Sequence, residues 1–192
     1  GGAVPVTSNS QFLGTIASIP GQYGISLNPE SFASFGTAKY FTDKNNGVVL
    51  KFVGNQIQQI SNVGMSDFFR DALKSASKAI GSYDEYHSQY TLTLQGTCYN
   101  SNSDTNVATA SDGYLTVSFD EATGGWGSFK SYNPEVALSL NNTFYSFKEG
   151  NLWLHHSEDV DRNTFYGAGG FTPTSLEIIM NDAPSVIKSF RT

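Results

Sequence analysis

The segment AKYFTDKNNGVVLKFV, residues 38–53, decides the fold class of this chain. Asn46-Gly47 in its middle is the dipeptide most typical of a tight hairpin, because both central residues of a type I′ turn need a positive φ. The residues on either side are rich in β-branched and aromatic types, which favour strands. A second tight turn at residues 54–55 leads into residues 56–60, where polar and apolar residues alternate. These features predict an antiparallel meander of three strands.

Strand-like segments recur along the rest of the chain and are separated by turns rich in Gly, Asn and Asp. They lie at residues 82–84, 89–94, 114–119, 126–129, 143–147, 152–156 and 175–180. One helix interrupts them: Ser66 is a good N-cap, Asp67 suits the positive end of the helix dipole, and a narrow apolar face follows. We therefore predict a mainly β chain of antiparallel hairpins and meanders, with one short helix over residues 67–79.

A loose repeat in these hairpins is compatible with two β architectures. Each unit has an aromatic residue, then usually Asp, a turn and a return strand, and the Asp side chain is expected to bind the amides of its own turn. The aromatic positions Phe41, Tyr83, Phe119 and Phe147 are 42, 36 and 28 residues apart. Propeller blades recur about every 40–45 residues, whereas an antiparallel sandwich also contains aromatic hairpins. The sequence leaves a propeller-like arrangement and a sandwich open.

The chain divides into two parts by composition. Residues 1–19 are small and polar, and we expect them to form an extended arm or linker, while residues 20–192 form a single β-rich domain. The chain begins at Gly1 without a methionine and without the basic start of a secretory signal. We therefore expect it to be a segment of a larger polypeptide.

Charge and hydropathy argue against several classes of partner. The 192 residues include 11 Lys and Arg against 17 Asp and Glu, a formal net charge of −6, with no basic stripe for phosphate contacts. No apolar run approaches the roughly 18 residues of a membrane span. We therefore expect neither nucleic acid nor a membrane as partner. The single cysteine, Cys98, excludes an internal disulfide. Only 15 % of the residues are charged, which favours a neutral, polar surface suited to proteins or sugars.

The sequence contains none of the common catalytic, nucleotide-binding or metal-binding motifs. His155 and His156 are adjacent on a predicted strand, so their side chains should point to opposite faces and not share one metal ion. Glu158, Asp159 and Asp161 offer the oxygen ligands that calcium prefers, but they lack the spacing of a calcium-binding loop. We therefore expect no catalytic residue, no metal and no cofactor.

Exposed aromatic rings can stack on sugars, which makes Trp126, Tyr132, Trp153 and Tyr166 candidates for a carbohydrate platform. Large aromatic residues more often fill a core or a subunit contact. The two interpretations differ in what they require, because a platform needs exposed, coplanar rings and a core or interface needs packed ones.

A set of phrases spreads over most of the chain. They are residues 22–32 (QYGISLNPESF), 39–44 (KYFTDK), 60–71 (ISNVGMSDFFRD), 80–84 (IGSYD), 125–132 (GWGSFKSY), 154–157 (LHHS) and 162–167 (RNTFYG). As a set they resemble virion structural proteins of tailed phages, particularly the tail-associated proteins of marine cyanophages. The resemblance covers roughly residues 22–192, and in that family such phrases lie within much longer polypeptides.

The resemblance implies a virion structural module of the tail, baseplate or nozzle, held in the phage particle by contacts with copies of itself and with other tail proteins. It supplies no catalytic residue. Tyr132, Trp153, Phe165 and Tyr166 are the residues we expect first at such an interface. Two alternatives stay open: a module that binds a host surface glycan, and a glycan depolymerase, which needs two carboxylates about 5–10 Å apart in one cleft.

Overall fold

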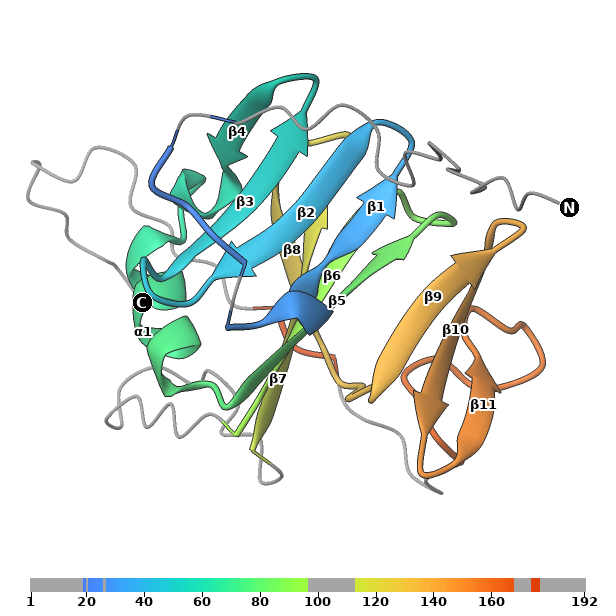
Figure 1. The fold of residues 1–192 in the computed structure, drawn as a ribbon. Coiled ribbons are helices and arrows are strands. Elements are labelled where there is room, and N and C mark those ends of the chain that lie inside the picture. Colours follow the sequence, from blue (N-terminus) through green and yellow to red (C-terminus); the bar gives the residue numbers. More distant parts are fainter. Residues whose placement is uncertain (1–18, 20, 26, 97–112, 168–173, 177–192) are drawn as a thin grey trace, which may run out of the picture.

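The structure, a computed structural model, describes residues 19, 21–25, 27–96, 113–167 and 174–176 (Figure 1). These residues form three antiparallel sheets, two short 3-10 helices and one α-helix, which confirms the predicted mainly β fold with one helix. None of their helices is long and apolar enough to cross a membrane. The predicted arm apart from Ile19, the cysteine Cys98 and most of the predicted strand at residues 175–180 lie outside the described residues.

Each sheet is a meander in which strands adjacent in the chain are adjacent in the sheet. The first sheet contains β1 (Ala33–Phe35), β2 (Ala38–Asp43), β3 (Val48–Val53) and β4 (Gln56–Gln59). The second contains β5 (Lys78–Asp84), β6 (Gln89–Gln95), β7 (Tyr114–Asp120) and β8 (Gly125–Lys130). The third contains β9 (Val136–Leu140), β10 (Thr143–Lys148) and β11 (Asn151–Leu154). The 3-10 helix η1 (Pro29–Ser31) precedes β1, and η2 (Ile60–Asn62) and α1 (Ser66–Ser75) join the first sheet to the second.

The hairpin predicted from residues 38–53 is confirmed, but its turn differs from the predicted type. Asp43 pairs with Val48, so residues 44–47 form the loop between β2 and β3. Gly47 takes a positive φ of 66° there, and the backbone N–H of Asn46 donates to the Asp43 carboxylate over 3.1 Å. A four-residue loop, in which the Asp43 carboxylate accepts the Asn46 N–H, thus replaces the two-residue turn.

Helix α1 confirms the predicted helix, although it ends at Ser75 rather than at residue 79. Ala76 already has an extended backbone, with a ψ of 135°, and the Ser77 N–H donates to the carbonyl oxygen of Gln95 in β6. The helix therefore ends where the backbone begins to pair with β6 of the second sheet.

The first two sheets pack face to face and share one core, and Figure 1 shows the first sheet lying across the second. The buried residues that meet there include Tyr40 and Val49 from the first sheet, Tyr90, Leu92 and Val117 from the second, and Phe69, Ala72 and Leu73 from α1. No closed barrel forms among the described residues, and the packing is consistent with a sandwich. Strand β5 also contacts β9, which attaches the third sheet to the second.

The predicted role of the Asp residues in the repeat is confirmed at three hairpins. In each case one carboxylate oxygen accepts one or two backbone N–H groups of the turn that follows. The pairs are Asp43 with Asn46, Asp84 with Tyr86 and His87, and Asp120 with Ala122 and Thr123. Each Asp side chain stabilises its own turn by these hydrogen bonds. The aromatic–Asp pattern can therefore recur in turns of different length.

Acid is expected to weaken the fold through Asp43. Burial acts to raise the pKa of this carboxyl, but hydrogen bonds from Asn46 and Gly24 outweigh it and hold the pKa below its usual value of 3.8. A carboxyl whose folded-state pKa is lowered stabilises the fold above its unfolded-state pKa, and that contribution disappears as the pH falls through the folded-state value. Urea denaturation at pH 7 and pH 3 should therefore show a smaller loss of stability in Asp43→Asn than in the wild type. Asp159→Asn, at an exposed position, should keep the wild-type loss.

Candidate functional site

The third sheet has one covered face and one open face, because side chains alternate along its strands. Ala137 and Phe144 point to the covered side and are buried with Tyr132 in a second, small core. Phe165 and Tyr166, from the segment after β11, pack against the same core. The covered face is therefore filled by the chain itself.

The open face of the third sheet is apolar and exposed to solvent. Register places its side chains in two cross-strand rows, Leu138 with Tyr145 and Leu154, and Val136 with Phe147 and Leu152, and Leu140 beside Thr143 extends them. The exposed fractions are 53 % for Val136, 42 % for Leu138, 61 % for Leu140, 39 % for Phe147, 59 % for Leu152 and 53 % for Leu154. None of these eight side chains is charged.

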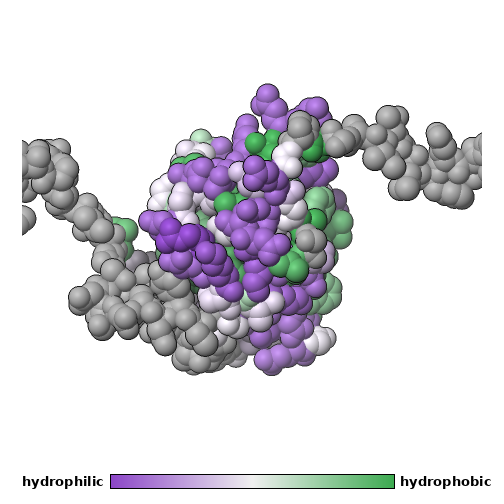
Figure 2. All heavy atoms as spheres, turned by 60° about the vertical axis from the view of Figure 1, so that its left-hand side comes forward, coloured by the Kyte–Doolittle hydropathy of each residue, from purple (hydrophilic) through white to green (hydrophobic). Residues whose placement is uncertain are grey.

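The side of the molecule that carries α1 has a different character. Figure 2 brings this side forward and shows it mostly hydrophilic, with hydrophobic residues in small, separate areas. Exposed ion pairs contribute to it, such as those of Arg70 with Asp67 and Asp71. Exposed apolar side chains on strands are therefore concentrated on the third sheet, at the right of Figure 1.

Four of the five aromatic residues singled out from the sequence come together on the covered face of the third sheet. The rings of Tyr132 and Phe165 are 5.2 Å apart and inclined by 54°, and those of Trp153 and Tyr166 are 5.6 Å apart and inclined by 76°. These inclined rings do not form the coplanar platform that a sugar site needs.

Trp126, the fifth of these residues, lies apart from the others at the edge of the main core. Its ring packs 4.4 Å from that of Phe69, and its indole N–H donates to the Ile60 carbonyl oxygen over 3.0 Å. Trp126 therefore joins β8 to α1 and η2.

The two adjacent histidines diverge, as predicted, although they follow β11 rather than lie on it. Nε2 of His155 is 2.7 Å from Oγ of Ser146, and both side chains are buried. Burial lowers the pKa of His155 to about 4, which keeps this imidazole neutral at physiological pH. Because Ser146 is fully buried, this pair serves the packing of the covered face rather than chemistry on a substrate.

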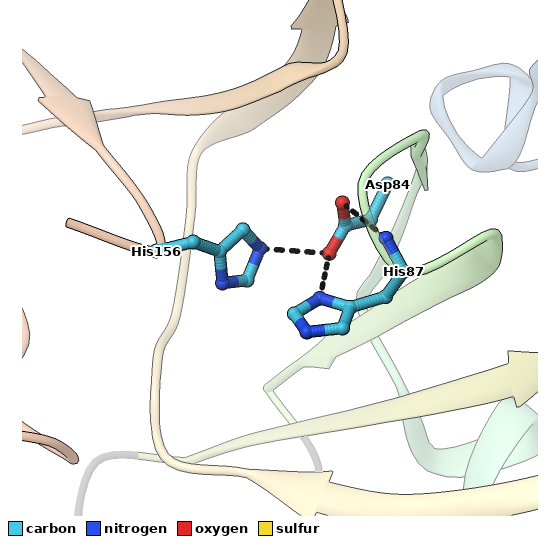
Figure 3. Close-up of side chains that lie close together, drawn as sticks. All are labelled: Asp84, His87 and His156. Carbon is cyan, nitrogen blue, oxygen red and sulfur yellow. Dashed lines mark hydrogen bonds and ion pairs between the residues drawn. The ribbon is translucent and has the colours of Figure 1, made fainter. Parts of the chain in front are cut away.

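His156 turns the other way and joins Asp84 and His87 in a cluster, hereafter the Asp–His cluster (Figure 3). Asp84 is the last residue of β5, His87 lies in the turn before β6, and His156 lies two residues beyond β11. Oδ2 of Asp84 is 3.0 Å from Nδ1 of His87 and 2.9 Å from Nε2 of His156. The cluster therefore joins the second sheet to the end of the third.

The Asp84 carboxyl is almost fully buried, while the two imidazoles reach solvent. The exposed fraction of the side chain is 4 % for Asp84, 44 % for His87 and 26 % for His156. Burial acts to raise the pKa of Asp84, but hydrogen bonds from His156 and His87 outweigh it and hold the pKa below its usual range. Tyr86 covers one side of the cluster, with its ring 5.2 Å from that of His156 and nearly parallel to it.

The Asp–His cluster was not among the sites predicted from the sequence. Asp84 and His87 are three residues apart at one predicted turn, and this spacing could have indicated that two potential metal ligands lie together. The contact with His156 could not be predicted in this way, because it depends on how the sheets pack. The acidic residues Glu158, Asp159 and Asp161 are exposed. They belong to no potential metal-binding group in the part of the chain that the structure describes.

The chain was compared with protein families and with curated proteins. No family model matches the chain. A search of curated proteins likewise finds no match.

Proposed function

We propose that this chain is a structural module of a tailed-phage virion, which assembles through the open face of its third sheet. The resemblance in sequence phrases supports the phage context. The observation that carries the assembly role is the pair of apolar cross-strand rows on that face. Their exposed fractions correspond to roughly 500 Å² of apolar surface, near the upper end for the largest patch on an ordinary monomer.

The occupant that we propose for the open face is the same face of a second copy of the chain. The first two sheets cover their own apolar faces by packing against each other, so sheet-on-sheet contact is already the way in which this chain buries such residues. A symmetric contact places the two rows of one copy against the same two rows of the other, and the absence of charge in the rows means that no like charges meet.

The size of the face sets the strength of this contact. Two such faces bury about 1,000 Å² together, which is at the lower limit for a specific interface. An isolated pair should therefore associate weakly and depend on concentration. The proposal requires several copies side by side in the virion, where weak contacts between neighbours add up.

Sedimentation of the purified chain over a range of concentrations tests the contact. The wild type should move from monomer towards dimer as the concentration rises. Leu138→Lys should remain monomeric, because it places a charge in the middle of a row. Leu27→Lys is the matched control at another exposed leucine, with 55 % of its surface accessible, and should behave like the wild type. A wild type that stays monomeric at the highest concentration would contradict self-association.

The virion context needs a separate measurement. Peptides of this chain should be found by mass spectrometry in purified tailed-phage particles. If particles with otherwise complete protein coverage contain none, the structural role in the virion is wrong, whatever the chain does in solution.

A further inference from the structure

The Asp–His cluster gathers three potential metal ligands, two from one hairpin turn and one from a segment that is distant in the sequence. The ligand atoms of Asp84, His87 and His156 all lie within 4.8 Å of one another. In Figure 3 both imidazoles point at the same carboxylate oxygen, one from the β5–β6 turn and one from the chain beyond β11. The fold therefore directs three donor groups at one point.

Two imidazoles and one carboxylate are a ligand set that suits zinc. Zinc sites with an open coordination position commonly use three protein ligands of these types and complete the tetrahedron with water. With metal–ligand bonds of about 2.0–2.1 Å, neighbouring donor atoms in a tetrahedron are about 3.3 Å apart. The carboxylate–imidazole distances of 3.0 and 2.9 Å are close to this value. All three donor atoms lie within 4.8 Å of one another, so rotations of the exposed imidazoles are the adjustment that an ion requires.

The surroundings of Asp84 resemble those of a supported metal ligand. Its Oδ1 accepts the backbone N–H groups of Tyr86 and His87, over 3.0 and 3.3 Å, which fixes the carboxylate and leaves Oδ2 facing the imidazoles. Hydrogen bonds of this kind orient the ligands of natural metal sites. The exposure of His87 leaves a path from solvent for the ion and for the water that completes its coordination.

We propose that Asp84, His87 and His156 bind one Zn²⁺ ion, with Oδ2 of Asp84, Nδ1 of His87 and Nε2 of His156 as ligands. The ion clamps the β5–β6 turn of the second sheet to the chain that leaves the third sheet. This site is independent of the open face, since the two differ in residues and in chemistry.

Zinc binding is measured by calorimetric titration of the untagged protein after removal of metal by a chelator, with Ca²⁺ as the mismatched ion. The wild type should bind one Zn²⁺ per chain, bind no Ca²⁺ and melt at a higher temperature when Zn²⁺ is present. His156→Asn and His87→Asn should each lower the affinity for Zn²⁺ about a hundredfold or more, because loss of a ligand exceeds the 10- to 100-fold effect of losing its support.

The variants are chosen to keep the fold. His156 has a φ of 60°, and asparagine tolerates this left-handed conformation better than most residues. His87 is in an exposed turn, so His87→Asn remains a test even if the change at position 156 disturbs the structure. Circular dichroism checks that both variants are folded.

Asp84 and Asp120 supply a matched pair of substitutions. Both carboxylates accept two backbone N–H groups of a hairpin turn, but only Asp84 has histidine partners. Asp84→Asn should weaken zinc binding strongly, whereas Asp120→Asn should leave it unchanged. Absence of Zn²⁺ binding by the wild type, or equal binding by the wild type and by the two histidine variants, would overturn the proposal.

Discussion

Gly81→Ala is expected to lower the free energy of unfolding by about 4 kcal/mol or more, an effect at the upper end for single substitutions. A Cβ atom at this position in β5 would lie 1.9 Å from the carbonyl oxygen of Ser31 and 2.5 Å from its carbonyl carbon. Both are backbone atoms, so no change of rotamer can relieve the overlap. Either β5 or η1 has to move.

Ser31 has little freedom to move, because it joins η1 to both sheets. Its carbonyl oxygen accepts the Tyr90 hydroxyl over 2.8 Å. Its own hydroxyl donates to the Asn28 carbonyl oxygen and accepts the Thr42 N–H, over 2.7 and 2.9 Å. A shift large enough to admit a methyl group would strain or break these buried bonds, and each broken bond leaves a buried polar group unsatisfied.

Gly127→Ala is the matched control, since Gly127 also lies in a strand of the second sheet. A Cβ atom there would meet its nearest neighbours, two oxygen atoms of Ser118, at 3.7 Å, which is ordinary contact. Urea denaturation followed by circular dichroism measures both variants against the wild type. An effect of Gly81→Ala no larger than that of Gly127→Ala would show that η1 yields to β5.

Local signals in the sequence were sufficient for most of the first two sheets. The hairpin around Gly47 and the turns capped by Asp43, Asp84 and Asp120 are determined by residues close together in the chain. Strand β9 was missed, and its sequence VALSL shows why. Its large side chains alternate with small ones, and the structure puts the large ones on the open face. Sequence patterns assign large apolar residues to a buried face, whereas here these residues lie on the exposed face.

The candidate sites depended on contacts that local patterns do not contain. Trp126 and Tyr132 are both aromatic, and the sequence predicts the same role for both. The packing of the sheets nevertheless places them at different cores. His156 reaches Asp84 only because the chain beyond β11 returns to the β5–β6 turn. The sequence reveals which groups are able to act, while the order in which the sheets stack decides which of them meet.

Phe69→Ala is the second substitution with a large expected effect, a loss of about 3–5 kcal/mol in the free energy of unfolding. Phe69 is fully buried in α1 and belongs to the core that the first two sheets share. Its ring packs against those of Phe68 and Trp126 with centroids 5.1 and 4.4 Å away. Truncation to alanine removes these contacts and leaves a cavity where the helix and the sheets meet. Strand pairing holds the sheet side of this cavity, so the site collapses only in part.

Phe32→Ala separates this packing effect from the mere loss of a phenyl ring. Phe32 follows η1 and is 47 % exposed, so its truncation should cost less than about 1 kcal/mol. Both variants are unfolded in urea and followed by circular dichroism. Because Trp126 contacts Phe69 directly, a change in tryptophan fluorescence should accompany Phe69→Ala in the folded state and not Phe32→Ala. Equal stability losses in the two variants would mean that α1 is only loosely attached to the sheets, and that the core is sufficient without it.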